Sequence, residues 1–303
     1  MNDNNMLYPV IVDGKYGYID NRGKLLIDTK FDYAEEFEGD FAIVEVDGKC
    51  GFINKDGEYV IQPKYEEVNN FKEGLAAVKL GYTWGYINEG GKEVIPNSFL
   101  DAYDFSEGIA LVQIGGKQGY IDKEGNIIIE PKYNYAHNFK EGLAAVDIND
   151  KFGYIDKNEN IIIPPKFIMA NEFSEGLAAV EVKNGCGYIN KDGDMVIDPK
   201  FDEVDDFYNG HALVGKEDLF GYINRDGEEV ISIKYENIDI IGEELVAAQI
   251  EDKWGYLNLK GETVIEPKFN EAYDFKNGIA AVEVKNKLGY INKNGEYIWK
   301  PQR

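Results

Sequence analysis

Few residues of this chain have side chains and spacings that suit catalysis or metal binding. The chain has only two histidines, His137 and His211. Neither has a Cys or another His nearby at the spacing of zinc ligands, so we expect no zinc site. An enzyme needs a convergent set of unique reactive groups, whereas nearly every reactive residue here belongs to a column that recurs along the chain. The sequence therefore predicts a protein that is not an enzyme and holds no metal or cofactor.

The two cysteines also fit a structural role. Cys50 and Cys186 each come directly before a glycine that recurs along the chain. Aromatic or aliphatic residues fill most other positions of that column, so we interpret both cysteines as small hydrophobic side chains in a packing slot. Free cysteines suit a reducing compartment, and no window has the apolar length of a membrane helix. A cytoplasmic protein without membrane insertion is the resulting expectation.

One column of Asp and Asn is complete, and it allows two interpretations. Carboxylates at regular spacing could hold a ladder of calcium ions, but calcium sites usually collect several carboxylates and Asn predominates here. Asn and Asp can equally close a turn by accepting hydrogen bonds from backbone N–H groups two residues on. We favour the turn. The column contains Asp20, Asn54, Asn88, Asp122, Asp156, Asn190, Asn224, Asn258 and Asn292.

These columns exist because the chain is a repeat array. A glycine within an aromatic-rich pentapeptide recurs every 34 residues, at Gly17, Gly51, Gly85, Gly119, Gly153, Gly187, Gly221, Gly255 and Gly289. A fixed period of this length indicates units that bury their apolar faces only against neighbouring units. No linker interrupts the pattern, so residues 1–303 are predicted to form a single array of about nine units.

Within one unit, β-strand signals dominate. Residues 75–80 and 84–88 alternate apolar and polar positions and are close enough to form a hairpin, and a third strand follows at 92–95. Equivalent third strands end in proline, which suits an edge or a strand end. Beyond the proline, Tyr65, Val68 and Phe71 are spaced by three, and this spacing predicts one helical turn with all three side chains inward.

The expected architecture follows from the length of the unit. Propeller blades usually have four strands and need about 40 residues or more. We therefore expect an all-β open superhelix or solenoid of three-stranded repeats. A closed propeller-like ring is the alternative, because the chain begins and ends in phase with the repeat.

The repeated pattern resembles the bacterial WG-repeat family. It consists of an aromatic residue, Gly, Tyr, Ile and Asp or Asn, a turn glycine, Pro-Lys-aromatic, and a Phe before Glu-Gly-Leu-Ala. Residues 84–88 (WGYIN) and 254–258 (WGYLN) keep the Trp-Gly pair, and the resemblance covers essentially the whole chain. It implies a β-rich interaction array without a shared set of catalytic residues.

The tyrosine after each repeat glycine is one candidate binding feature. Successive strand residues face opposite ways, so these tyrosines lie on the face opposite the following isoleucines. A continuous stripe could bind peptides or stack on sugar rings, or it could be a second packed layer between units, which we favour. The candidate tyrosines are Tyr86, Tyr120, Tyr154, Tyr188 and Tyr222.

A second candidate is the stretch 211–244, where the repeat pattern fails. A specialised surface and simple sequence drift are both compatible with this stretch. We take His211 and Lys216 as its candidate binding residues. The departures are His211 and Lys216 in apolar columns, Ser232 and Ile233 in place of a residue-proline pair, and Ile241 and Glu244 in place of Phe and Gly.

The charge limits the class of partner. A net charge of −24 disfavours binding to nucleic acid or to anionic lipid, since both require clustered Lys and Arg. Carboxylates gather at one place in every unit, as in DEVDDFYNG (202–210), and should form an acidic ridge. That ridge is either a solvated face or a site for a basic partner. We therefore predict a scaffold that binds a protein or peptide, with a carbohydrate or cell-envelope binder using the aromatic columns as the alternative.

Overall fold

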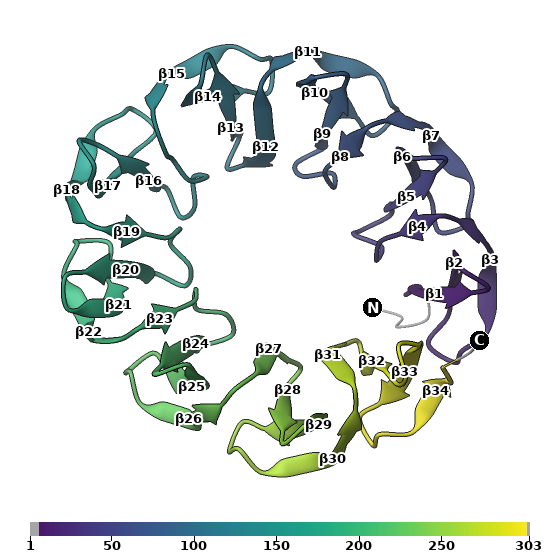
Figure 1. Cartoon of the computed structure of the whole chain (residues 1–303). Helices are drawn as coiled ribbons and strands as arrows, with labels where there is room; N and C mark the ends of the chain where they lie inside the picture. The colour runs from purple at the N-terminus through teal and green to yellow at the C-terminus, as the bar shows by residue number, and fades with distance from the viewer. Residues whose placement is uncertain (1–5, 302–303) are drawn as a thin grey trace.

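The computed structural model describes residues 6–301, and these residues form a closed ring of nine β-sheets. The sheets are arranged like blades around a central opening, and the first and last blades lie side by side (Figure 1). The protein is thus a nine-bladed β-propeller. The open superhelix expected from the sequence is wrong, and the ring that was its alternative is correct.

The strands of the first five blades are β1 (Tyr8–Val12), β2 (Lys15–Ile19), β3 (Leu25–Phe31); β4 (Tyr33–Ala34), β5 (Ala42–Val46), β6 (Lys49–Ile53), β7 (Tyr59–Tyr65); β8 (Glu67–Val68), β9 (Leu75–Leu80), β10 (Thr83–Asn88), β11 (Glu93–Phe99); β12 (Asp101–Ser106), β13 (Ile109–Ile114), β14 (Lys117–Asp122), β15 (Ile127–Tyr133); and β16 (Ala144–Asp147), β17 (Phe152–Ile155), β18 (Ile161–Phe167). Those of blades 6 to 9 are β19 (Met169–Ala170), β20 (Ala178–Val182), β21 (Gly185–Ile189), β22 (Met195–Phe201); β23 (Glu203–Val204), β24 (His211–Lys216), β25 (Leu219–Asn224), β26 (Glu229–Tyr235); β27 (Ile238–Gly242), β28 (Leu245–Ile250), β29 (Lys253–Asn258), β30 (Thr263–Phe269); and β31 (Glu271–Lys276), β32 (Ile279–Glu283), β33 (Leu288–Asn292), β34 (Tyr297–Trp299).

Most blades contain a fourth strand where the sequence predicted a helical turn. Val68 belongs to the short strand β8 and pairs with Val78 of β9, so the helical turn is wrong. The spacing of three was still informative, because Tyr65, Val68 and Phe71 pack in one cluster as expected. A two-residue strand followed by an irregular segment produces the same spacing. The three-stranded unit is therefore also wrong, since an inner strand this short lets 34 residues supply four strands.

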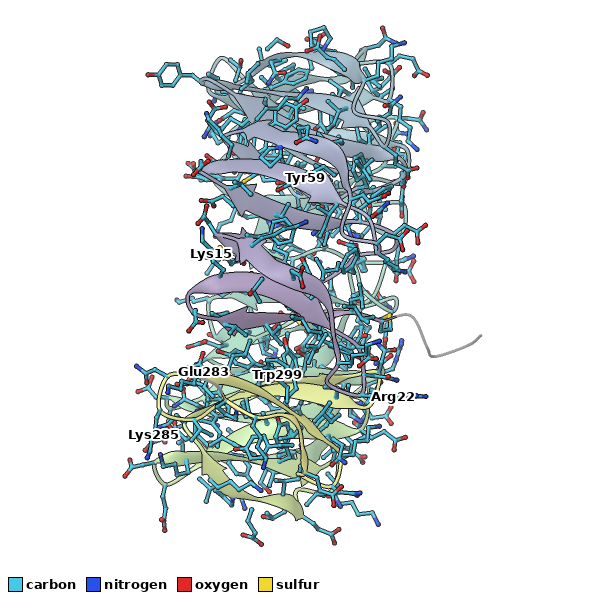
Figure 2. All side chains as sticks on the ribbon, turned by 90° about the vertical axis from the view of Figure 1, so that its right-hand side faces the viewer. Lys15, Arg22, Tyr59, Glu283, Lys285 and Trp299 are labelled. Carbon is cyan, nitrogen blue, oxygen red and sulfur yellow. The ribbon has the colours of Figure 1, made fainter. Side chains whose placement is uncertain are left out.

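The two faces of the ring carry different connections. Figure 2 shows the ring from its edge, with Lys15 and Lys285 beside the hairpins on one face and Arg22 in a turn on the other. We call these the hairpin face and the turn face. On the turn face the Asp and Asn column acts as expected: Asp20 Oδ1, for example, accepts hydrogen bonds from the backbone N–H groups of Arg22 and Lys24, both at 2.9 Å. The turn interpretation is confirmed for this column.

The repeat glycines allow the outermost strand to cross its neighbour closely. A Cβ atom on Gly51 would lie 2.5 Å from the carbonyl oxygen of Ile61, and Gly119 and Gly187 have equivalent contacts. Any side chain there would displace the outer strand. The prolines of the pattern, such as Pro131 in β15, lie on this outermost strand, where no ladder partner needs their missing N–H.

The core lies between consecutive blades. Tyr154 of blade 5 is fully buried, and its ring packs on Phe173 of the next blade with a centroid distance of 4.9 Å. Its hydroxyl donates to the backbone oxygen of Asn171, 2.8 Å away. Burial raises the pKa of the Tyr154 phenol well above its ordinary value, so the hydroxyl remains a donor. The same Tyr-to-backbone bond recurs from Tyr18, Tyr86, Tyr120, Tyr188, Tyr222 and Tyr256.

Closing the ring requires a different contact, because the described residues give blade 1 only three strands. Tyr8 stands where the other units have Ala or, once, Val. Its buried ring packs on Tyr290 of blade 9, with 5.7 Å between centroids. At most other junctions a tyrosine packs on a Phe from the inner segment of the next blade, as Tyr154 does on Phe173. The large Tyr8 side chain therefore takes the role of that phenylalanine.

Two further contacts complete the closure. Tyr290 donates a hydrogen bond to the carbonyl of Pro9 at 2.6 Å. In most other units, the carbonyl at the position equivalent to Pro9 accepts a hydrogen bond from a backbone N–H of the inner segment. Pro9 has no N–H, so this residue contributes no unpaired donor to the inner edge of β1. Lys276 of blade 9 reaches across blade 1 to Glu36 of blade 2, with 3.1 Å between Nζ and Oε2.

We predict that Tyr8→Ala lowers the free energy of unfolding by about 3–5 kcal/mol, the usual cost of removing a buried aromatic side chain. Tyr82→Ala is the control, since Tyr82 is 94% exposed, and it should change stability by less than about 0.5 kcal/mol. Urea unfolding monitored by circular dichroism measures both. Equal stability of the two variants would show that Tyr8 does not close the ring.

Candidate functional site

Most neighbouring blades are joined on the turn face by an ionic staple. Glu141, in the inner loop of blade 5, accepts hydrogen bonds from the N–H of Gly176 in blade 6. The same carboxylate pairs with Lys191 of blade 6 at 2.9 Å. The other staples pair Glu73 with Lys123, Glu107 with Lys157, Glu175 with Arg225, and Glu243 with Lys293.

The junction between blades 7 and 8 lacks this staple and also lacks the aromatic pair. Asn209 and Leu259 stand at the positions of the staple carboxylate and its cation. Ile241 stands where Phe packs on tyrosine at most other junctions, so Tyr222 has an aliphatic neighbour instead of a ring. Two of the contacts that join other blades are therefore replaced here by smaller or neutral side chains.

A turn glycine gives independent support for a wider spacing at this junction. A Cβ on Gly193 or Gly227 would lie 2.9–3.1 Å from an isoleucine of the preceding blade. At Gly261, the equivalent residue of blade 8, such an atom would meet nothing within 4 Å. Blades 7 and 8 are thus less closely packed at this turn.

A cavity of about 420 Å³ opens at this junction, and we call it the junction cavity. Its lining comes from blades 6 to 9 and combines apolar with charged side chains. Phe207, Tyr222 and Ile241 are buried members of the lining, whereas Tyr208 and Ile240 are 60% and 55% exposed. The missing aromatic ring at position 241 leaves room that a phenylalanine would occupy.

Carboxylates surround the junction cavity. Asp205, Asp206 and Asp274 all belong to its lining. Lys276 pairs with Asp274 at 3.6 Å and with Glu36, so its charge is balanced within the protein. Within residues 6–301, no ion pair includes Asp205 or Asp206. The walls of the cavity therefore combine apolar side chains with carboxylates, and their net charge is negative.

Burial raises the pKa of Asp206 to about 6. The hydrogen bond that Asn171 Nδ2 donates to Asp206 Oδ1, at 3.2 Å, acts in the opposite direction. The nearby carboxylates of Asp205 and Glu172 reinforce the increase. Asp206 is thus a carboxylate held in an unfavourable environment, and a cation beside it would stabilise its charged form.

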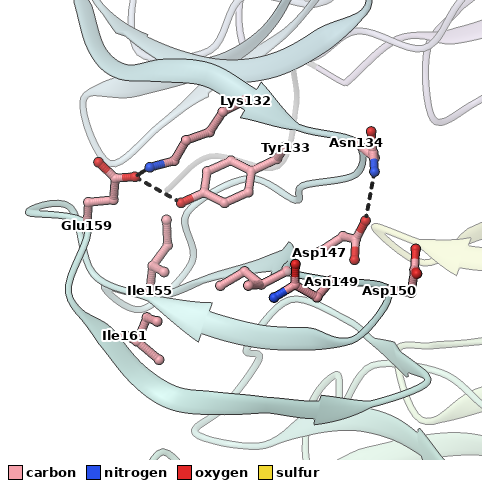
Figure 3. A pocket seen from close by; sticks show the side chains of 10 residues that line it. Lys132, Tyr133, Asn134, Asp147, Asn149, Asp150, Ile155, Glu159 and Ile161 are labelled. Atoms are coloured by element: carbon pink, nitrogen blue, oxygen red, sulfur yellow. Dashed lines mark hydrogen bonds and ion pairs between the residues drawn. The ribbon is translucent and has the colours of Figure 1, made fainter.

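Other cavities belong to the repeat itself. Figure 3 shows one of about 610 Å³ between blades 4 and 5, where Glu159 accepts a hydrogen bond from the Tyr133 hydroxyl at 3.1 Å and pairs with Lys132. A second cavity, lined by Lys234, Tyr235 and neighbouring segments, lies at the equivalent place between blades 7 and 8. We therefore select the junction cavity, whose lining has no such counterpart among the cavities described.

The structure separates the residues that the sequence proposed for binding. The tyrosine column is buried between blades and forms no exposed stripe; Tyr86, Tyr120, Tyr154, Tyr188 and Tyr222 are at most 4% exposed. The packed layer, which was the favoured interpretation, is what the structure shows. Of these tyrosines, only Tyr222 lines the junction cavity.

The two residues proposed from the irregular stretch lie at opposite ends of β24. His211 lines the junction cavity, with Nδ1 2.8 Å from the backbone oxygen of Asn209. Lys216 is exposed beside the hairpin and contacts none of the cavity. His137 lies in another cavity, where burial lowers its pKa.

The cysteines lie in different blades, and burial raises the pKa of both thiols. Cys50 and Cys186 are half-buried and free. A raised pKa disfavours the reactive thiolate, so their environment fits the packing role expected for them.

Asp205 and Asp206 were not singled out from the sequence beyond their place in the acidic ridge. Two neighbouring features of the sequence could have indicated this site. The same stretch of chain that has paired aspartates precedes the unit in which the column phenylalanine becomes Ile241. Only the ring brings these positions together around one cavity.

Comparisons with known proteins support the repeat and the fold. The family described as WG containing repeat matches residues 16–50, 51–84, 84–117, 119–152, 152–186, 187–219, 220–254 and 254–287. A crystal structure of a eukaryotic initiation factor is similar with a TM-score of 0.70 and 9% identity, covering 96% of this chain and 94% of that one. No curated protein matches the sequence.

A second similar structure is the dihydro-heme d1 dehydrogenase NirN in complex with DHE. Its TM-score is 0.52 at 11% identity, covering 88% of this chain and 74% of NirN. At such low identities these similarities show the fold alone, since one fold hosts many functions. No helix in the described part of the chain is long and apolar enough to cross a membrane.

We predict that Asp206→Asn stabilises the protein at pH 7 but not at pH 4. The pKa of Asp206 in the folded state lies above the ordinary value of 3.8, so the folded state binds this proton more tightly than the unfolded state does. The wild-type protein therefore loses part of its free energy of unfolding as the pH rises from about 4 to 6 and Asp206 becomes charged. Because Asp206 is partly exposed, we expect a gain of only about 1–2 kcal/mol above pH 6.

Urea unfolding of both proteins from pH 4 to pH 8 measures this difference. Asn can keep the hydrogen bond from Asn171, so the comparison isolates the charge. A stability difference that does not change with pH would contradict the raised pKa.

Proposed function

The chain belongs to the WG containing repeat family, and we propose that it is a non-catalytic propeller scaffold that binds a basic protein or peptide segment at its acidic inner surface. A β-propeller of tandem repeats is a fold consistent with a binding scaffold. The proposal includes no catalytic step. The cytoplasmic location expected from the sequence is kept as part of it, and cell fractionation would test it.

The charge of the inner segments carries this proposal. The inner strands and their loops occupy residues 32–40, 66–74, 100–108, 134–142, 168–176, 202–210, 236–244 and 270–278. These segments contain 24 Asp and Glu residues but only three lysines and no arginine. They surround the central opening (Figure 1). Carboxylates concentrated around one opening attract cationic partners and repel nucleic acid and anionic lipid.

Part of this charge is already used within the ring. The staple carboxylates, such as Glu141, are paired with a cation of the next blade. Others are outside the ion pairs of the described residues, including Glu35 and Asp239, and burial raises the pKa of both. These carboxylates remain available to a positively charged partner.

Nothing in the structure favours the carbohydrate alternative in the form that the sequence suggested. That hypothesis relied on tyrosine faces at regular spacing, and those faces are buried between blades. A sugar ring would have to separate two blades to reach them. We therefore propose only the protein- or peptide-binding function.

We predict that an eight-residue peptide of alternating Lys and Gly binds the protein at physiological salt, whereas the matching Glu-Gly peptide does not. The triple variant Glu35→Gln, Glu203→Gln, Asp239→Asn removes three inner charges and should weaken binding by about fivefold or more, about 1 kcal/mol. Fluorescence anisotropy of the labelled peptides measures this change.

The matched control removes three charges from exposed positions of the outermost strands, by Asp28→Asn, Glu130→Gln and Asp198→Asn. It should leave the affinity within about twofold, because the net charge of the two variants is the same and only the place differs. If both triple variants weaken binding equally, the affinity depends only on the net charge of the protein, and the inner surface is not a specific binding site.

A further inference from the structure

We infer that the junction cavity binds the side chain of a lysine or arginine from the basic partner, with the aliphatic stem in the apolar interior and the cationic head beside Asp205 and Asp206. This inference rests on the proposed function and adds to it a defined subsite. The cavity lies at the junction of blades 7 and 8, on the turn face and toward the central opening.

The interior of the cavity results from one change in the repeat. At the junction of blades 5 and 6, Phe173 fills the space against Tyr154, with ring centroids 4.9 Å apart. At the junction of blades 7 and 8, the smaller Ile241 occupies the equivalent position beside Tyr222. The remaining space has apolar walls, so it suits methylene groups rather than a polar chain.

The lining supplies the negative charge that such a side chain needs. Asp205 and Asp206 are consecutive residues and have no cationic partner in the described part of the protein. Their backbone and amide hydrogen bonds, from the Asp206 N–H at 2.8 Å and from Asn171 at 3.2 Å, leave other carboxylate lone pairs available. A guanidinium or ammonium group in the cavity can form charge-assisted hydrogen bonds with these free lone pairs.

The cation already present does not satisfy this site. Lys276 lines the cavity, but its ammonium group pairs with Asp274 of the same strand and with Glu36 in the contact that closes the ring. The remaining charge of the lining is therefore negative. An anionic or neutral side chain would leave Asp205 and Asp206 unpaired and partly desolvated, which is unfavourable.

Lysine and arginine match this combination better than other side chains. Both have an aliphatic stem that packs on apolar surface while the charged head stays near water or a carboxylate. The cavity volume of about 420 Å³ lies within the range of small ligand pockets. Exposed Tyr208 and Ile240 at the opening add apolar contacts for the neighbouring residues of the partner.

The test uses four peptides, Ac-Gly-X-Gly-NH₂, in which X is lysine, arginine, norleucine or glutamate. Norleucine matches the stem of lysine without its charge. Binding is followed by NMR through the methyl signals of isoleucine, which include those of Ile240 and Ile241. We expect the lysine and arginine peptides to bind at least about tenfold more tightly than the norleucine peptide, a modest effect for a charge-assisted contact.

Two variants of the protein locate the site. Ile241→Phe restores the ring found at other junctions and should reduce binding of the lysine peptide by about tenfold, because the cavity is filled. Ile240→Ser changes an exposed residue at the opening, so it should fold normally and reduce binding by about threefold. Thermal unfolding confirms that each variant is folded.

The control for charge uses an equivalent position elsewhere in the ring. Asp104 accepts a hydrogen bond from Asn69 at 2.9 Å, just as Asp206 accepts one from Asn171. Asp206→Asn should weaken binding several-fold, whereas Asp104→Asn should leave it within about twofold. Equal effects of the two substitutions, or equal affinity for norleucine and lysine, would overturn the inference.

The result also separates this inference from the proposed function. If Ile241→Phe binds the lysine peptide as wild type does, the junction cavity is not the subsite, even if longer basic peptides still bind the inner surface. The opposite result is also distinguishable. If the short lysine peptide binds in the cavity but the inner triple variant binds the Lys-Gly peptide as tightly as wild type does, the subsite is supported and the proposed binding along the acidic inner surface is wrong.

Discussion

The structure depends on the contact between a tyrosine of one blade and the inner segment of the next. Each blade is a small sheet that cannot bury its own aromatic residues. Tyr154 is therefore buried by Phe173 and held by the backbone oxygen of Asn171, all across a blade boundary. An aromatic pair and a hydrogen bond each contribute about 1 kcal/mol. Repetition around the ring makes these modest contacts sufficient.

A ring adds a requirement that an open array does not have, because the last blade must find a partner in the first. The described part of blade 1 has no inner strand to offer. Tyr8 and Pro9 compensate, since one supplies the missing aromatic ring and the other exposes a carbonyl without an unpaired N–H. The least regular residues of blade 1 are thus those that close the fold.

The junction of blades 7 and 8 departs from this pattern of contacts. The ring needs close contacts at its junctions, so a junction without a staple or an aromatic pair sacrifices stability. Asp206 adds to this cost, because burial raises its pKa. Residues that weaken a fold locally are commonly those that bind a partner. This physical contrast, more than the number of carboxylates, distinguishes the junction cavity from the other cavities.

The sequence by itself determined the repeat, its β-strands, its turn chemistry and its acidic character, because these follow from local patterns such as the spacing of Gly51 and Gly85 or the Asn88 turn. It did not determine the fourth strand, since β8 is only two residues long and resembles a helical turn in spacing. Nor did it determine closure or the cavity at Asp206. Those depend on the angle between blades and on contacts between residues far apart in the chain, such as Tyr8 with Tyr290, which only the assembled ring brings together.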